Sequence, residues 1–239
     1  METIDNTTAE APSRVKIESA HERAVEIIRS EILRGALSPG QWLIEAELAA
    51  QLRLSRGSIR SALIEIAGEG LIERMQFRGA RVRKVDREGA IRLTEVRVVV
   101  EGLLASKAAT NATDLELEEI ASIKSAMLQS VSDGDLGAYS ASNNLLHHRI
   151  ALAARHEEAH EIVRRLRGLS GLTHQFHLAT LPGRASTSLN EHCALVDAVI
   201  LRDPDAAEQV MKSHLLSVVQ ALKAAPSHLY SLLGYEADG

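Results

Sequence analysis

The chain has 239 residues, with 27 Lys and Arg against 32 Asp and Glu and a formal net charge of −5. Its length exceeds that of an average domain and predicts two domains. The single cysteine, Cys193, excludes an internal disulfide, and the opening METIDNTTAEAPSR lacks the basic start and apolar run of a secretory signal. No apolar stretch approaches the roughly 18 residues of a membrane span. We therefore expect a cytoplasmic protein with no membrane partner.

Basic residues are concentrated near the start of this acidic chain. From Arg14 to Lys84 there are 13 Lys and Arg against 9 Asp and Glu, and the excess is strongest after Arg53. A concentrated positive face neutralises phosphates and releases counterions, which is typical of a DNA-binding surface. A solvated basic face without a partner would explain the charge equally well. The pattern of predicted helices and strands distinguishes a DNA-binding surface from a solvated basic face.

The basic region has the pattern of a winged helix-turn-helix. Residues 1–17 are small and polar and predict a flexible tail, followed by a DNA-binding domain over 18–85. Apolar spacing, a stop at Gly35 and a cap at Ser55 predict three helices, and two short strands joined by a turn that contains Gly79 predict a two-stranded wing. The predicted elements are helices over 21–34, 45–52 and 56–68 and strands over 71–74 and 80–84.

The first turn of the third helix is polar and basic, whereas Ile59, Leu63 and Ile66 recur on its other face. Recognition helices present their N-terminal residues to DNA, with serine hydroxyls and helix N–H groups on phosphates and arginine able to pair with guanine. The candidate DNA-binding residues of this helix are Ser55, Arg56, Ser58 and Arg60. In the wing, Arg78 and Arg81 could reach a groove or a phosphate.

Several separated motifs in this region resemble the DNA-binding domain of the GntR family of regulators. They are ILRGALSPGQ from Ile32, LSRGSIRSAL from Leu54, EGLI from Glu69 and RGARV from Arg78. The resemblance implies that the third helix faces an operator and that Gly79 lies at the wing tip. The residues implied to face the operator are Ser55, Arg56, Gly57, Ser58 and Arg60. Gly57 stands where the family usually has threonine, and Ala46 stands where some members have a DNA-contacting arginine.

Residues 86–239 show helical periodicity almost throughout and predict an all-α bundle of about six helices. Capping signals place the starts of several helices: Thr113 with Glu116, Ser188 with Glu191, and Asp203 before Pro204. The predicted helices cover 88–110, 114–132, 135–155, 157–180, 188–202 and 204–225.

Three of the ten histidines are expected to reach the core of this bundle. Asn143 and His147 are four residues apart and share one helix face, and His192 and His214 each have apolar neighbours on later helices. Three imidazoles and an amide oxygen could enclose a divalent ion. The alternative is that these histidines are hydrogen-bonded or exposed without any metal, because no short-spaced pair of histidines supports the metal site.

The same region resembles the FadR-type ligand-binding domain called FCD, in which an aspartate and three histidines bind a metal. The resemblance rests on NNLLHHRI from Asn143, on Glu191-His192 and on MKSHL from Met211. It implies the ligands Asn143, His147, His192 and His214, with zinc as the first choice and nickel, manganese or iron as alternatives. Asn143 stands where the family usually has a carboxylate.

The implied effector is a small carboxylic acid bound near the metal. Arg97, Tyr139 and Gln175 are candidate effector-binding residues, although an internal ion pair with Glu101 would explain Arg97 as well. The predicted function is a homodimeric repressor that leaves an inverted-repeat operator in double-stranded DNA when the acid binds, and not an enzyme. The alternatives are a metal-dependent enzyme with a three-histidine centre and an architectural DNA-binding protein without an effector.

Overall fold

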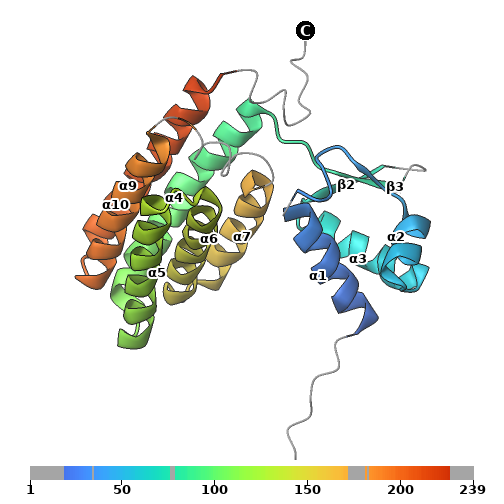
Figure 1. Ribbon diagram of the computed structural model, residues 1–239. Helices are drawn as coiled ribbons and strands as arrows, with labels where there is room; N and C mark the ends of the chain where they lie inside the picture. Colours follow the sequence, from blue (N-terminus) through green and yellow to red (C-terminus); the bar gives the residue numbers. More distant parts are fainter. Residues whose placement is uncertain (1–18, 34, 76–78, 172–180, 182, 227–239) are drawn as a thin grey trace, which may run out of the picture.

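The computed structural model describes residues 19–33, 35–75, 79–171, 181 and 183–226 of the chain (Figure 1). A helix-turn-helix with a small sheet forms the N-terminal domain, and a bundle of long helices forms the C-terminal domain (Figure 1). The predicted mainly helical fold is therefore confirmed. No described helix is both long enough and apolar enough to cross a membrane.

The N-terminal domain is built around three helices whose apolar faces meet in one core. These helices are α1 (Ala20–Leu33), α2 (Glu45–Leu52) and α3 (Arg56–Gly68). Ile28, Ile32, Ile59 and Ile66 are fully buried in this core. The predicted cap of α3 is present, because the Ser55 hydroxyl accepts a hydrogen bond from the backbone N–H of Ser58 at 3.0 Å.

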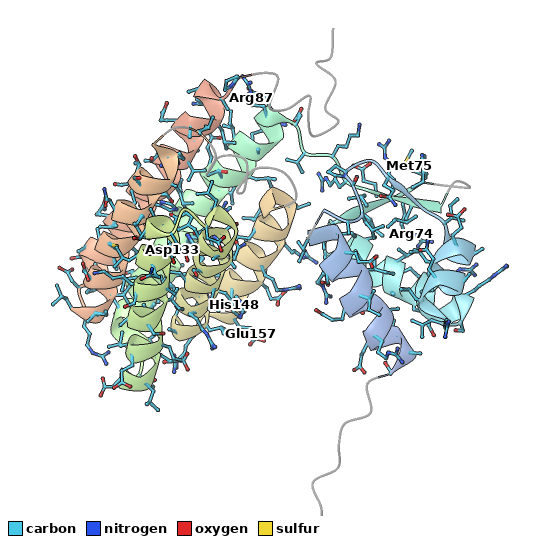
Figure 2. All side chains as sticks on the ribbon, viewed as in Figure 1. Arg74, Met75, Arg87, Asp133, His148 and Glu157 are labelled. Atoms are coloured by element: carbon cyan, nitrogen blue, oxygen red, sulfur yellow. The ribbon has the colours of Figure 1, made fainter. Side chains whose placement is uncertain are left out.

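The wing is a three-stranded antiparallel sheet in the order β1-β3-β2. The predicted hairpin is formed by β2 (Ile72–Met75) and β3 (Gly79–Val82), with Arg74 and Met75 on its outer strand (Figure 2). The prediction of two strands missed β1 (Trp42–Leu43), which pairs with β3. A strand of two residues is too short to show an alternating pattern in the sequence.

The C-terminal domain follows the predicted helices closely. Its described helices are α4 (Arg87–Asn111), α5 (Asp114–Ser132), α6 (Leu136–Ala153), α7 (Glu157–Gly171), α9 (Arg184–Ile200) and α10 (Pro204–Ala224). Leu104, Ile120, Leu146, Leu195 and Met211 come from five of these helices and are buried in one core. The Thr113–Glu116 capping box is present, and Asp203 caps α10 before Pro204 at its first turn.

The predicted cap at Ser188 is wrong. Helix α9 begins four residues earlier, after Gly183, whose positive φ of 75° suits a glycine. Ser188 consequently lies inside the helix, and its hydroxyl is 3.4 Å from Nδ1 of His192. The helix predicted over 157–180 is present to Gly171, and the rest of that range lies outside the described residues.

Candidate metal centre and DNA-binding surface

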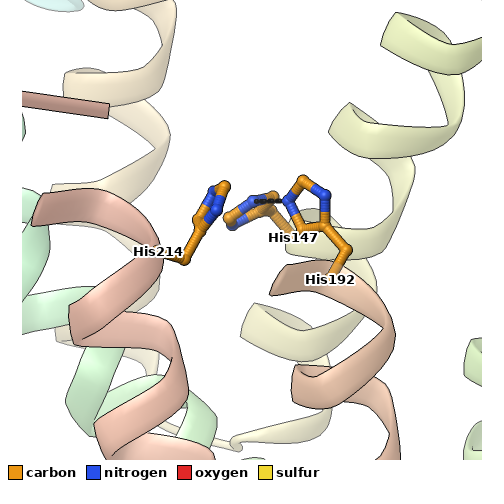
Figure 3. A group of neighbouring side chains, drawn as sticks. All are labelled: His147, His192 and His214. Carbon is orange, nitrogen blue, oxygen red and sulfur yellow. Dashed lines mark hydrogen bonds between the residues drawn. The ribbon is translucent and has the colours of Figure 1, made fainter. Parts of the chain in front are cut away.

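Three buried histidines from three helices converge in the C-terminal domain (Figure 3). His147 comes from α6, His192 from α9 and His214 from α10, and their exposed fractions are 3%, 1% and 4%. One ring nitrogen from each lies within 4.8 Å of the others, and Nε2 of His147 is 3.2 Å from Nε2 of His192. The fold thus brings together three histidines that lie far apart in the sequence, with 45 residues from His147 to His192 and 22 from His192 to His214.

A polar side chain holds the other nitrogen, Nδ1, of each imidazole. Nδ1 of His147 lies 2.6 Å from Glu101, and Nδ1 of His214 lies 2.7 Å from Glu191. Nδ1 of His192 lies 3.2 Å from the Tyr139 hydroxyl. Metal-binding histidines characteristically use their second nitrogen in this way, because the partner fixes both the ring and its tautomer. The arrangement leaves the Nε2 atoms to face the centre.

Burial keeps the three imidazoles uncharged. It lowers the pKa of His147 to about 3, and it lowers the pKa of His192 well below its usual value. Burial also lowers the pKa of His214, although Glu191 opposes the shift. Since only a neutral imidazole has a lone pair for a cation, the three rings are in the protonation state that metal binding requires.

Asn143 is the fourth ligand that the resemblance implies. It lies one helical turn before His147 on α6, and its Oδ1 is the buried side-chain atom that has no hydrogen-bond partner within the described part of the chain. A buried polar oxygen without a partner is costly, and coordination to a cation removes that cost. Three imidazole nitrogens and one amide oxygen suit zinc and related divalent ions. The side chains therefore fit the metal site that the resemblance implies.

Buried charges surround the centre. Arg97 lies 2.5 Å from Glu101, which confirms the internal ion pair predicted as the alternative to an effector role for Arg97. Arg167 contacts the same carboxylate at 3.3 Å and Oδ1 of Asn144 at 3.1 Å. Burial alone would raise the pKa of Glu101, but Arg97, Arg167 and His147 outweigh it and hold that pKa well below its usual value. Glu101 is thus a carboxylate shared by two guanidinium groups and an imidazole.

Several of these partners are not predicted from the sequence. Local spacing predicts Arg97 as the partner of Glu101 and a capping box for Glu191, and it predicts no role for Arg167 or Arg184. Arg184 donates to Ser217 at 2.9 Å and lies 3.4 Å from Glu191. One signal was present: Glu101 interrupts an apolar run, and a buried carboxylate needs partners. Gln175 lies outside the described residues, whereas Tyr139 lies at the centre as the partner of His192.

His148 lies outside the centre, as its position beside His147 on a helix predicts. It is exposed, and its ring centroid is 5.7 Å from that of His160 (Figure 2). It therefore provides a natural comparison for His147.

The candidate DNA-binding residues lie at the exposed N-terminal end of α3. Ser55, Arg56 and Gly57 are exposed, and the Ser55 and Ser58 hydroxyl oxygens are 2.9 Å apart. The Arg60 guanidinium is also exposed but lies 2.9 Å from Glu45 of α2.

The wing residues complete the predicted surface. Gly79 begins β3 with a φ of 91°, and a side chain there would be strained. Arg81 of β3 pairs with Glu73 at 3.0 Å, and Arg78 lies outside the described residues. The assignment of these residues and of those on α3 to DNA contacts stays a prediction.

Comparison with known proteins places both domains. Residues 20–82 match the family described as bacterial regulatory proteins, gntR family, and residues 92–217 match the FCD domain. The probable D-xylose utilization operon transcriptional repressor of Paenarthrobacter nicotinovorans is 28% identical over 202 residues, which are 82% of this chain and 85% of that protein. The galactonate operon transcriptional repressor of Escherichia coli (strain K12) is 28% identical over 226 residues, which are 84% and 96% of the two chains.

A solved structure, E. coli McbR/YncC, has the same fold. Its TM-score is 0.70 at 20% identity, and the match covers 90% of this chain and 98% of that one. The FCD match alone spans more than half of the chain, and the relatives named above are transcriptional repressors. The comparisons therefore do not support the alternative of a metal-dependent enzyme. The chain belongs to the FCD-domain branch of the gntR family of bacterial regulatory proteins, and it is a ligand-responsive, DNA-binding transcription regulator.

Proposed function

We propose that this regulator is a repressor that a small carboxylic acid releases from its operator by binding at the centre formed by His147, His192 and His214. The observation that carries the proposal is the convergence of three neutral imidazoles whose Nδ1 atoms are all held by other side chains. The same chain has a basic helix-turn-helix, so a ligand site and a DNA-binding surface occur in one molecule.

The centre has the donor atoms for a divalent cation. Nε2 of His147, His192 and His214 and Oδ1 of Asn143 would hold it, with zinc as the first choice and nickel, manganese or iron as alternatives. When bound, the cation supplies open coordination positions and a positive charge that attract a carboxylate. Glu101 and Glu191 keep two of the imidazoles oriented, and burial keeps all three neutral. These roles belong to the chain's own residues.

The proposed effector class is a hydroxylated carboxylic acid. Two relatives are named as repressors of a D-xylose utilization operon and a galactonate operon, which makes sugar acids the first compounds to test. Tyr139 is proposed to contact such a ligand because its hydroxyl lies 3.2 Å from Nδ1 of His192, whereas the Arg97 guanidinium is paired with Glu101. Gln175 remains a candidate from the sequence.

The regulator is proposed to act as a homodimer in the cytoplasm, because an inverted-repeat operator needs two recognition helices on successive major-groove faces. Exposed apolar side chains on α4 and on α10, which packs against α4, support a second copy as the partner: Val96, Val99, Leu103 and Leu216. Light scattering of the purified protein tests this, with Val99→Glu expected to yield monomers. A wild-type monomer at micromolar concentration would contradict it.

Elemental analysis and ligand binding test the central proposal. Purified protein should contain about one divalent ion per chain, and chelation should lower its melting temperature because the ion binds only the folded state. Galactonate and other sugar acids should raise the melting temperature of the zinc-loaded protein and weaken binding to a DNA duplex selected from a random pool. A metal-free protein that still binds acids and releases that duplex would contradict the proposed site.

A further inference from the structure

Helix α7 contacts both domains at its C-terminal end. In Figure 1 it is the helix of the bundle that faces the N-terminal domain. A methyl group on Gly168 would lie 3.2 Å from the Leu71 side chain, and one on Gly70 would lie 3.6 Å from the Leu169 side chain. Gly70 and Leu71 lie where α3 ends and β2 begins. The last turns of α7 are therefore packed against the end of the predicted recognition helix.

An ion-pair cluster crosses the same junction. Glu69 is the C-cap residue of α3, and its nearly buried carboxylate pairs with Arg29 of α1, whose Nε lies 2.9 Å from it. Arg164 of α7 approaches the same carboxylate from the other domain at 3.7 Å. The Glu69 carboxylate thus connects α7 to α1 and α3.

One helical turn further along, α7 reaches the histidine centre. Arg167 contacts Glu101, and Glu101 contacts Nδ1 of His147. Arg164 and Arg167 are three residues apart on one rigid helix, so a displacement of one moves the other. Leu169 adds an apolar contact, because it packs in a buried cluster with Val85 and Ile91 at the connection to α4.

We infer that α7 is the link that transmits occupancy of the histidine centre to the DNA-binding domain, through Arg167 on the ligand side and Arg164 on the DNA side. This rests on the proposed function, in which the centre binds a ligand. A ligand at the centre fixes His147 and therefore Glu101, and Arg167 moves with the Glu101 carboxylate. Because Arg164 lies on the same helix, its contact with Glu69 then repositions the end of α3. Coupling of this kind requires a physical element whose state both sites influence, and α7 contacts both.

The only tryptophan makes the inference testable in the full chain. Trp42 lies in β1 of the N-terminal domain, so its fluorescence reports the unfolding of that domain, while circular dichroism is dominated by the helical bundle. Urea unfolding is followed by both signals with EDTA or with saturating Zn²⁺. In the wild type, Zn²⁺ is expected to raise the midpoint of both transitions.

Charge reversal at the junction should separate the two signals. Arg164→Glu places a carboxylate beside Glu69 and is expected to reduce the Zn²⁺-dependent shift of the Trp42 midpoint by at least half, while the dichroism shift is retained. Arg164→Lys should restore the shift, and Arg165→Glu, an equal charge change at the adjacent exposed position, should leave it unchanged. A Trp42 shift of wild-type size in Arg164→Glu would overturn the inference.

A second arm does not depend on metal binding. Leu146→Ala destabilises the core of the helical domain. In EDTA it should lower the urea midpoint followed by Trp42 fluorescence when it is the only substitution, but not when it is combined with Arg164→Glu. If Zn²⁺ moves neither signal while this arm shows coupling, the proposed metal site fails and the link stands. If Leu146→Ala leaves the Trp42 midpoint unchanged in the wild-type background, the link is refuted.

Discussion

Replacing Glu101 by glutamine is expected to weaken metal binding through a residue that does not itself bind the metal. Glu101 accepts from Nδ1 of His147 at 2.6 Å and pairs with Arg97 and Arg167 in the buried interior. Removing a carboxylate that orients a metal-binding histidine costs roughly 10- to 100-fold in metal affinity. We therefore expect the zinc dissociation constant of Glu101→Gln to rise by about that factor.

The same substitution also removes the partner of two buried guanidinium groups. Breaking a buried ion pair from one side costs about 3–5 kcal/mol, which is a large part of the roughly 5–15 kcal/mol that stabilises a typical domain. Glu191→Gln is the matched control, because Glu191 orients His214 in the same way but its side chain is 21% exposed. It should lose a similar factor in zinc affinity with a smaller loss of stability.

The assay is zinc competition with a chromophoric chelator, together with urea unfolding followed by circular dichroism. Measuring both variants separates the loss of affinity from the loss of folding. A folded Glu101→Gln protein whose zinc affinity is within twofold of the wild type would refute the role assigned to Glu101.

Four further predictions concern the centre and the DNA-binding helix. His214→Ala should abolish stoichiometric zinc in elemental analysis, whereas His148→Ala, at an exposed position, should retain it. Arg56→Ala should weaken DNA binding and lower the slope of log affinity against log salt by about 1 in fluorescence anisotropy, and an unchanged slope would place Arg56 off the phosphates. With EDTA, the contribution of His147 to the free energy of unfolding should be fully present above about pH 7 and should fall as the pH decreases from 6.5 toward about 3. The reason is that His147 binds a proton in the unfolded chain, whereas its lowered pKa prevents this in the folded chain. Urea titrations should show a loss of about 1 kcal/mol between pH 7 and 5.5 from this group alone. Asn143→Asp should tighten zinc binding and weaken sugar-acid binding in calorimetry, since a carboxylate cancels one of the cation's charges, and tighter binding of both would contradict this account.

Local signals in the sequence predicted the helices well because each depends on residues close together in the chain. The bounds of α2 and the cap of α3 at Ser55 follow from apolar spacing and a hydroxyl at the right position. The error at Ser188 shows the limit of such signals, since Ser-x-x-Glu also occurs inside a helix and only the backbone at Gly183 shows where α9 begins.

Part of the site was also accessible from sequence, and part was not. The spacing of Asn143 and His147 on one helix face predicted their shared orientation. Glu101 and Arg167 could not be joined to the centre in this way, because they lie 46 residues before and 20 residues after His147 and approach it only through the packing of α4 against both α6 and α7. Tertiary packing, and not local pattern, positions these side chains around the three imidazoles.

The buried charges around the centre favour an anion over a neutral molecule as the proposed ligand. Arg97, Arg167 and Arg184 bring three guanidinium groups, whereas Glu101 and Glu191 bring two carboxylates, among the described side chains that contact one another there. The imidazoles are neutral, so this cluster is positive even without a cation, and a divalent ion held by neutral ligands would increase the excess. Because an uncompensated buried charge is costly, a small acid that reaches the centre removes a penalty that a neutral sugar would leave in place. We therefore expect a small acid to bind most tightly to a form of the protein in which this charge excess surrounds it, and such a difference in affinity between two forms is the condition for a ligand to shift a conformational equilibrium.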